Sequence, residues 1–451
     1  MFGRAAPWHW TPSWCTRIDM NGNGREAIVV VGAGIVGACT AWHLLRRGAD
    51  VTLIDRDEPG LGCSYGNAGA LSSGSVAPLA MPGVMRDALT MLLDPAAPLR
   101  IPPAYLPKAA PWLRRFVRAS EPNEVRRIAQ VLSTLLAHSI EKHVEILGEI
   151  GASDIVRRSG QLYLYPDEKS LRKDAMSWVL RKEHGIRIDR LGRGDILALE
   201  PEVGPDYTIG VFTPDQGMSV NPYRQVTAIA SDFVRRGGRI VRDRITAIEV
   251  SAADRVAAAR GESASYPCDH AVICAGAWSA QLLADLGYAL PLESQRGYHV
   301  VISSPGIVTA RPVIAADRKV FLTPMEDGLR VAGTVEFGGL APPPNRRRAE
   351  FLVRDVSRVF PRAQVPAEWS PWMGHRPCFP DSLPVMGPSR HRGLWFNFGH
   401  GHLGLTMSAT SGDVLARAIC GEPSNIDLAP LSFARFGRHS NRQWAAAVHG
   451  R

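Results

Sequence analysis

A run of apolar, mostly β-branched residues at 27–31 passes directly into a glycine turn at 32–37. The spacing of apolar residues over 36–45 is helical, and a second apolar run at 51–54 ends on Asp55. These patterns predict a buried parallel strand, a tight turn, a helix and a second strand. That order is typical of the first unit of a doubly wound α/β sheet.

Similar patterns continue along the chain. Segment 220–238 predicts a helix that ends at a glycine pair, and 239–250 alternates like a strand. Apolar strands that end in small residues are predicted before the turns at 274–279 and 399–404. A second, mostly antiparallel sheet is expected from strands at 161–165, 297–302, 320–324 and 329–334.

The first turn has glycines at 32, 34 and 37, in the spacing GxGxxG. The first glycine allows the tight turn, the second lets a pyrophosphate approach the backbone, and the third lets the helix pack close to the strand. Asp55 follows about twenty residues later, where a carboxylate can accept the hydroxyls of an adenosine ribose. The turn therefore predicts a dinucleotide site at the N-terminus of the helix.

Other small-residue segments indicate that this dinucleotide is long. The loop 58–69 contains Ser64 and Asn67, whose side chains can donate hydrogen bonds. An enzyme that uses NAD has no need of such a loop. Because the turns at 270–279 and 397–406 are distant in the chain, we expect one cofactor wrapped by discontinuous segments.

In these motifs the chain resembles the glycine oxidase and D-amino-acid oxidase superfamily of FAD flavoproteins. Within it, the chain is most similar to the bacterial D-amino-acid dehydrogenase branch. The matching features run in family order from about 27 to 436. Besides the first turn and Asp55 they are the loop 64–69, Asn221-Pro222, 275–278, Arg296-Gly297-Tyr298, 331–336, Arg376-Pro377 with Asp381, and 399–404.

The resemblance implies an α/β, Rossmann-type FAD-binding domain assembled from discontinuous segments. It also implies an α+β substrate domain with a mostly antiparallel sheet. We expect the FAD-binding domain at 26–85, 196–277 and 374–437, the substrate domain at 86–195 and 278–373, a disordered extension at 1–25 and a tail at 438–451. Met20 is an alternative start of the chain.

The resemblance further implies the residues that contact FAD. They are Gly32, Ala33, Gly34, Ile35, Val36, Gly37, Asp55, Arg56, Ser64, Asn67, Ala68, Gly69, Leu71, Ile245, Ala275, Gly276, Trp278, Gly399, His400, Gly401, His402, Leu403, Gly404 and Thr406. In the sarcosine-oxidase branch a flavin-linking cysteine stands seven residues before the aspartate that matches Asp381. Here that position is Gly374, so non-covalent FAD is expected.

Arg376 is the first candidate for substrate binding. A guanidinium grips a carboxylate through two parallel hydrogen bonds, which a lysine does not reproduce. The alternative is an ion pair of Arg376 with Asp381 or Glu336. Arg296 is a weaker candidate for the same cation.

Three further residues are candidates at the reacting centre. Tyr298 either binds the carboxylate, covers the pocket or packs in the core. His400 and His402 flank the last glycine turn, which in the family lies at the pyrimidine edge of the flavin. Backbone N–H groups and a helix dipole there stabilise the charge of the reduced flavin, so a histidine base is not required.

The activity that the resemblance implies is oxidation of D-amino acids to 2-oxo acids and ammonia. Hydride goes to flavin N5, and a quinone or other acceptor takes the electrons. The chain departs from the dehydrogenase branch at His375, Ser382 and around Gly297-Tyr298. D-Proline, hydroxyproline or another secondary amine is therefore an alternative substrate, with a dehydrogenase or oxidase acting on it. A non-catalytic flavin-binding subunit of a heteromeric amine dehydrogenase is an alternative of another class.

Composition agrees with a large cytoplasmic enzyme. At 451 residues the chain exceeds what one core usually fills, which favours two domains. Charged residues make up 21% and hydrophobic residues 45%, which excludes a disordered chain. The seven cysteines are scattered without a CxxC, so we expect reduced thiols and no metal site.

The charge and the segment 76–119 bear on partners. The net charge is +9, but the arginine clusters are short and separate, so no nucleic-acid partner is expected. No stretch reaches the roughly 18 apolar residues of a membrane span. Segment 76–119 mixes apolar residues and arginines, which suits either a roof over the substrate pocket or peripheral contact with the inner face of an anionic membrane.

Overall fold

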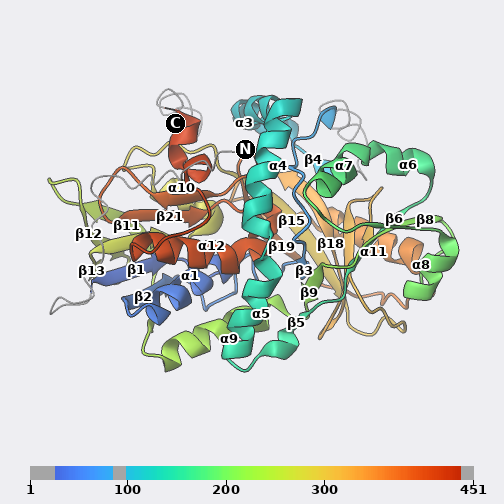
Figure 1. Cartoon of the computed structure of the whole chain (residues 1–451), viewed down its shortest axis with the longest axis horizontal. Helices are drawn as coiled ribbons and strands as arrows, with labels where there is room; N and C mark the ends of the chain where they lie inside the picture. The colour runs from blue at the N-terminus through green and yellow to red at the C-terminus, as the bar shows by residue number, and fades with distance from the viewer. Residues whose placement is uncertain (1–25, 85–97, 438–451) are drawn as a thin grey trace, which may run out of the picture.

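The two predicted sheets lie side by side (Figure 1) in a computed structural model that describes residues 26–84 and 98–437. The predicted extension 1–25 and tail 438–451 fall outside the described residues. In Figure 1 the sheet on the left includes β1 and β2, and the sheet on the right includes β15 and β18. Helices α4 (Pro122–Leu136) and α5 (Ser139–Glu149) cross the front of the molecule between them.

The first sheet has six strands in the order β10-β2-β1-β14-β21-β20, parallel except for the last pair. They are β10 (Arg239–Arg242), β2 (Asp50–Asp55), β1 (Ala27–Val31), β14 (His270–Ile273), β21 (Leu394–Phe398) and β20 (Val385–Pro388). The predicted α/β fold is confirmed.

Two layers cover this sheet because alternate side chains of β1 point to opposite faces. Ile28 and Val30 pack on one face with helices α1 (Ile35–Arg46), α9 (Pro222–Arg235) and α12 (Gly404–Ile419). Val29 and Val31 pack on the other, against a small antiparallel sheet. That sheet comprises β11 (Ile245–Val250), β12 (Val256–Gly261) and β13 (Ser265–Pro267).

The single strand predicted at 239–250 is wrong. β10 ends at Arg242 in the parallel sheet, and β11 begins at Ile245 in the antiparallel one. Asp243 turns the chain between them, because its carboxylate accepts the N–H groups of Arg244 and Ser263 and the hydroxyl of Tyr266.

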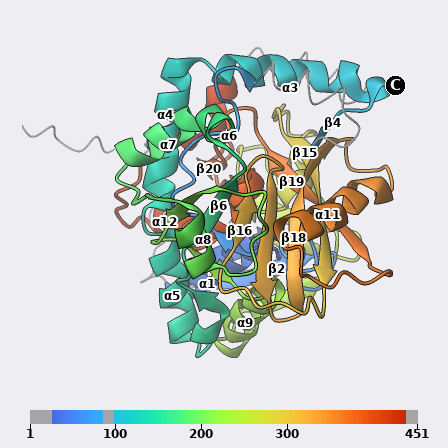
Figure 2. The same cartoon turned by 90° about the vertical axis from the view of Figure 1, so that its right-hand side faces the viewer.

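The second sheet has nine strands, and the four strands predicted for it fall within β6, β15, β17 and β18. Its main path is β19 (Pro371–Cys378), β15 (Glu293–Ile302), β18 (Gly328–Phe337), β17 (Val320–Met325), β16 (Val313–Ala315), β6 (Gln161–Tyr165), β8 (Ile209–Thr213) and β7 (Asp189–Leu191), and β4 (Leu99–Arg100) pairs with β18. All pairings are antiparallel except β16 with β6 and β18 with β4. Helix α11 (Arg346–Val359) packs on one face (Figure 2), and the other face borders the site.

The described part of the chain also contains shorter strands and further α-helices. They are β3 (Ala70–Leu71), β9 (Gly217–Ser219) and β5 (Val156–Arg157) in a three-stranded sheet, and helices α3 (Leu106–Ala119), α6 (Glu168–Lys173), α7 (Ala175–Glu183), α8 (Arg193–Leu199) and α10 (Ser279–Leu282). No helix in the described ranges is long and apolar enough to cross a membrane. The domain boundaries remain a prediction, to which the packing adds one observation: residues of α5 share the core of α1 and α12.

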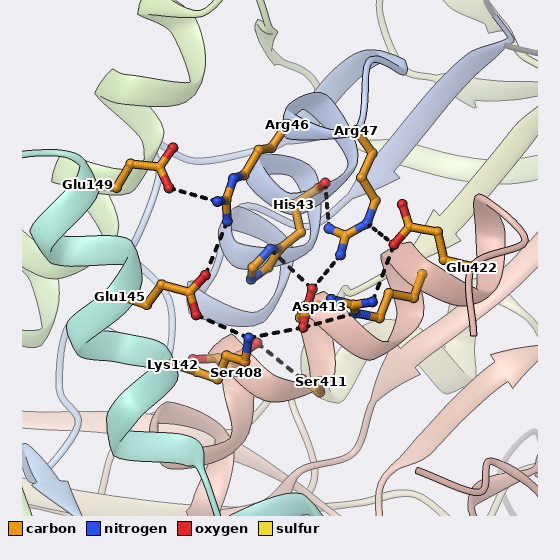
Figure 3. Close-up of polar contacts among 11 residues, drawn as sticks. His43, Arg46, Arg47, Lys142, Glu145, Glu149, Ser408, Ser411, Asp413 and Glu422 are labelled. Atoms are coloured by element: carbon orange, nitrogen blue, oxygen red, sulfur yellow. Dashed lines mark hydrogen bonds and ion pairs between the residues drawn. The ribbon is translucent and has the colours of Figure 1, made fainter. Parts of the chain in front are cut away.

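A buried carboxylate joins α1, α5 and α12 (Figure 3). Asp413 on α12 lies 2.6 Å from Arg47 Nη2, 3.4 Å from Lys142 Nζ and 3.7 Å from His43 Nδ1. Burial alone would raise the pKa of Asp413, but the surrounding cationic side chains outweigh it and lower the pKa to about 2. The carboxylate therefore stays ionised and ties the three helices together.

We predict that Asp413→Asn lowers the free energy of unfolding by about 3 kcal/mol at pH 7, because it leaves the partly buried cations Arg47 and Lys142 without their partner. Since the pKa of Asp413 is depressed in the folded state, the difference from wild type should shrink as the pH falls below about 4 and vanish near pH 2. Urea unfolding at several pH values measures this. Glu141→Gln, at an ion pair whose side chains are about half exposed, is the control and should have almost no effect.

Candidate cofactor and substrate site

A cavity of about 1040 Å³ lies between the two sheets. Its wall contains the ends of β1, β2, β14 and β21 together with the inner face of the second sheet. The predicted cofactor residues of every segment line it, with five exceptions: Ala33, Gly37, Gly69, Leu71 and Thr406. The chain-distant turns therefore meet in one place.

The first glycine turn is packed too closely for side chains. A Cβ atom at Gly32, where φ is +106°, would lie 2.5 Å from the carbonyl oxygen of Cys274 on the neighbouring strand. A Cβ at Gly37 would lie 1.8 Å from the carbonyl oxygen of Gly32. The missing side chains bring α1 close to the sheet and leave the N-terminus of α1 facing the cavity, where its N–H groups favour an anion.

Asp55 ends β2 at the wall of the cavity. Its carboxylate accepts the N–H of Ala33 at 2.6 Å and that of Asp57 at 3.1 Å. Burial raises the pKa of Asp55, and these two hydrogen bonds oppose the rise. The carboxylate thus braces the glycine turn and faces the cavity, as an acceptor for ribose hydroxyls would.

The loop 64–69 is held from both sides. Ser64 Oγ accepts the N–H of Ile35 at 2.9 Å, which ties the loop to the first turn. From β18, Arg330 donates to the carbonyl oxygens of Tyr65 at 2.9 Å and Asn67 at 3.0 Å. Sequence reasoning missed Arg330, because no local pattern marks an arginine on a strand as the support of a loop more than 260 residues away.

Two predicted residues form one edge of the cavity. The guanidinium of Arg56 lies 4.1 Å from the ring centroid of Trp278, a cation–π contact. The hydroxyl of Thr406, although outside the cavity wall, accepts the N–H of Ser72 and thereby supports the segment after the loop.

Both histidines of the last turn are uncharged at neutral pH. Burial lowers the pKa of His400 to about 3, and burial with the nearby charge of Arg376 lowers that of His402 to about 4. His400 is 3% exposed, and its Nε2 has no hydrogen-bond partner among the described residues. The turn therefore presents neutral rings and the N-terminus of α12 to the cavity, rather than a second cation.

Arg376 lies flat on the inner face of the second sheet. Its guanidinium carbon is where a side chain at Gly297 would be, since a Cβ there would come within 2.2 Å of it. Nη1 donates to the carbonyl oxygen of Thr334 at 2.9 Å. Within the described ranges no carboxylate pairs with Arg376, because Asp381 pairs with Arg435 and Glu336 with Arg296. The remaining N–H groups are available to an anion in the cavity.

Tyr298 lies on the opposite face of β15 from Arg376. Its side chain packs in the core under α11, and its hydroxyl donates to Glu336 and accepts the N–H of Asn345. It is 1% exposed. Its hydroxyl is thus already engaged, and we do not assign Tyr298 to the substrate.

Helix α3, at the top of Figure 2, contributes side chains to the wall of the cavity. Trp112, Leu113 and Phe116 from this helix line the cavity, and Trp112 Nε1 donates to the carbonyl oxygen of Cys378 at 3.2 Å. These contacts support the interpretation of this segment as a roof. Membrane contact by the same segment stays a prediction.

Comparisons with known proteins agree with this geometry. A family model described as DAO, FAD dependent oxidoreductase, matches residues 27–418. A D-amino-acid oxidase of Bradyrhizobium diazoefficiens is 38% identical over 92% of this chain and 99% of its own length. A D-amino acid dehydrogenase of Rhizorhabdus wittichii is 31% identical over 91% and 100%.

Solved structures show the same fold. Glycine oxidase from Geobacillus kaustophilus has a TM-score of 0.72 at 20% identity, covering 91% of this chain and 99% of that one. L-proline dehydrogenase from P. horikoshii has a TM-score of 0.71 at 16% identity, covering 92% and 98%.

We predict that Asp55→Ala weakens FAD binding by one to two orders of magnitude, or about 1.5–3 kcal/mol for a lost hydrogen bond to a charged group. Titration of apoprotein with FAD, followed by flavin fluorescence, gives the dissociation constant. The control is Glu58→Ala, three residues on and 62% exposed at its side chain. Unchanged affinity in Asp55→Ala would show that this carboxylate does not bind the ribose.

Proposed function

We propose, since this chain belongs to the DAO family of FAD-dependent oxidoreductases, that it oxidises D-amino acids to 2-oxo acids and ammonia. The observation that supports this substrate class is Arg376, a cavity-lining guanidinium with no carboxylate partner among the described residues. An α-amino acid supplies the missing carboxylate. The names of the relatives, both oxidase and dehydrogenase, point to the same substrates.

In this proposal the protein groups bind and orient the substrate. Arg376 holds the carboxylate through two parallel hydrogen bonds. FAD, when bound, would supply the acceptor for the hydride of the Cα–H bond. The substrate amine loses a proton, and water hydrolyses the resulting imino acid to the 2-oxo acid and ammonia. His400 and His402 are neutral, so we assign neither as the acid of this reaction.

The substrate is tested by anaerobic mixing of the purified protein with D-alanine, L-alanine, D-proline and hydroxyproline. Loss of flavin absorbance with D-alanine supports the proposal. Reduction by D-proline or hydroxyproline alone would make the protein a secondary-amine enzyme. Failure of the whole panel would favour a flavin-binding subunit without its own activity.

We propose that a quinone or another external acceptor takes the electrons. Steady-state turnover with D-alanine, measured once as hydrogen peroxide in air and once as quinone reduction without oxygen, compares the two acceptors. A dominant peroxide yield would identify an oxidase instead.

FAD is proposed to bind without a covalent bond. A side chain at 374 would collide with the ring of Trp372, which lies 2.1 Å from the place of a Cβ atom. We predict that acid precipitation leaves intact FAD in the supernatant. The thiol of Cys63 lines the same cavity, so flavin that stays with the precipitate would indicate a link there, and Cys63→Ser would then release it.

We predict that Arg376→Lys retains FAD but reduces the rate of flavin reduction by D-alanine at least tenfold, or about 1.4 kcal/mol. The ammonium keeps the charge and loses the paired geometry, so Cα is no longer held against the flavin. Anaerobic stopped-flow absorbance over a range of substrate concentrations measures this. Arg126→Lys, whose side chain is 55% exposed on α4, is the matched control. Equal rates of flavin reduction in the two variants would show that the carboxylate of the substrate binds elsewhere.

A further inference from the structure

A row of three side chains crosses the inner face of the second sheet beside the roof helix. Arg376 on β19 is paired with Gln295 on β15, and Gln295 is paired with Phe337 on β18. Residues directly opposite in neighbouring strands point to the same face, with Cβ atoms about 4.5–5.5 Å apart. All three residues line the cavity. Gln295 therefore lies beside the proposed carboxylate site.

Gln295 is a polar residue in the wall of the cavity. It is 5% exposed, and its amide makes no hydrogen bond to the described residues. Its amide oxygen and nitrogen are not fully enclosed by protein, because the fully buried polar atoms without a partner do not include them. Because the residue forms part of the cavity wall, the partner that its amide lacks is available from a ligand there.

The other residues on this face of β15 do not offer a polar side chain to the cavity beside Arg376. Glu293 has its side chain on the same face of β15, but it accepts the hydroxyl of Tyr105 at 3.0 Å and the N–H of Ser294 and lies outside the cavity wall. Gly297 has no side chain, and the guanidinium of Arg376 occupies the space above it. Gln295 is thus the polar side chain of β15 that faces the ligand next to Arg376.

We propose that the amide oxygen of Gln295 accepts a hydrogen bond from the amino group of the substrate whose carboxylate Arg376 holds. This inference rests on the proposed function, because it requires an α-amino acid in the cavity. The amine and the carboxylate of such a substrate share one carbon, so their binding groups must be neighbours. Arg376 and Gln295 are neighbours on adjacent strands.

A neutral amide suits the chemistry better than a carboxylate would. The amine must lose its proton before the Cα hydrogen leaves as hydride. An anionic neighbour favours the protonated ammonium and raises the pKa of the amine. The amide orients the nitrogen without adding a negative charge. Gln295 is therefore a positioning residue that leaves the amine free to become neutral.

The test compares a substrate with the same molecule lacking its amine. D-Alanine and propionate share the carboxylate and the methyl-bearing chain, so both use Arg376 and only D-alanine uses Gln295. In Gln295→Met we expect the apparent Kd of D-alanine, from saturation of anaerobic flavin reduction, to rise at least tenfold. The Kd of propionate, from the change in flavin absorbance, should change less than twofold. Gln130→Met, the same substitution at an exposed site on α4, should change neither.

A second variant gives an independent readout. Gln295→Glu keeps the size of the side chain and adds a charge, so the pH at which flavin reduction reaches half its maximal rate should rise by about one unit or more. A change in packing alone would not move this profile. If Gln295→Met fails to retain FAD, the pH profile of Gln295→Glu still tests whether residue 295 contacts the amine.

Other outcomes overturn the inference. Equal weakening of D-alanine and propionate in Gln295→Met would show that Gln295 acts on the carboxylate or on Arg376. Unchanged Kd values, or an unchanged pH profile in Gln295→Glu, would show that the amide does not contact the amine. If D-alanine and the other compounds of the panel fail to reduce the wild-type flavin, the proposed function fails instead, and the two failures are distinguishable.

Discussion

Close backbone packing at the first glycine turn is the constraint on which the rest of the site depends. The turn passes so near β14 that a side chain at Gly32 would overlap the carbonyl oxygen of Cys274. The same packing aims the N-terminus of α1 at the cavity and lets Asp55 brace the turn through Ala33. Because parallel strands present their carboxyl ends at one edge of a sheet, the turns after β14 and β21 meet at this place. Four segments distant in the chain thereby form one wall.

On the opposite wall of the cavity, the lack of a side chain at Gly297 makes room for the guanidinium of Arg376. Arg376 reaches across Gly297 to the carbonyl oxygen of Thr334. Burial lowers its pKa below the ordinary value for arginine, yet the guanidinium remains charged because that ordinary value is so high. Among the described residues this charge has no carboxylate counterion, which costs free energy of folding, and a bound carboxylate would return part of that cost as affinity. The same unpaired charge that lowers the stability of the fold would therefore favour carboxylate ligands.

Local sequence patterns predicted those elements whose structure depends on residues close to them in the sequence. In the first turn, β1, β2 and α9, the spacing of apolar, glycine and capping residues along the chain is enough to predict the element. The structure places these elements as expected. The strand at 239–250 was wrong because side-chain alternation continues through Asp243, whose buried hydrogen bonds move the chain from one sheet to another. Arg330 and Gln295 left no local signal, since each is defined by what faces it from another segment.

Tyr298 shows that a strand is easier to predict than the face of the sheet to which each of its side chains points. β15 was expected over 297–302, but the register between β15 and β18 shifts between Arg296 and Tyr298, where Thr334 adopts a φ of +57°. Side chains alternate along a strand, so the parity of the pairing decides which residues reach the cavity. That parity places Gln295 and Gly297 on the inner face, whereas the side chain of Tyr298 packs in the core under α11 although the residue also borders the cavity. A tyrosine is the more conspicuous residue in the sequence, but the pairing with Arg376 makes the glutamine the one available to the substrate.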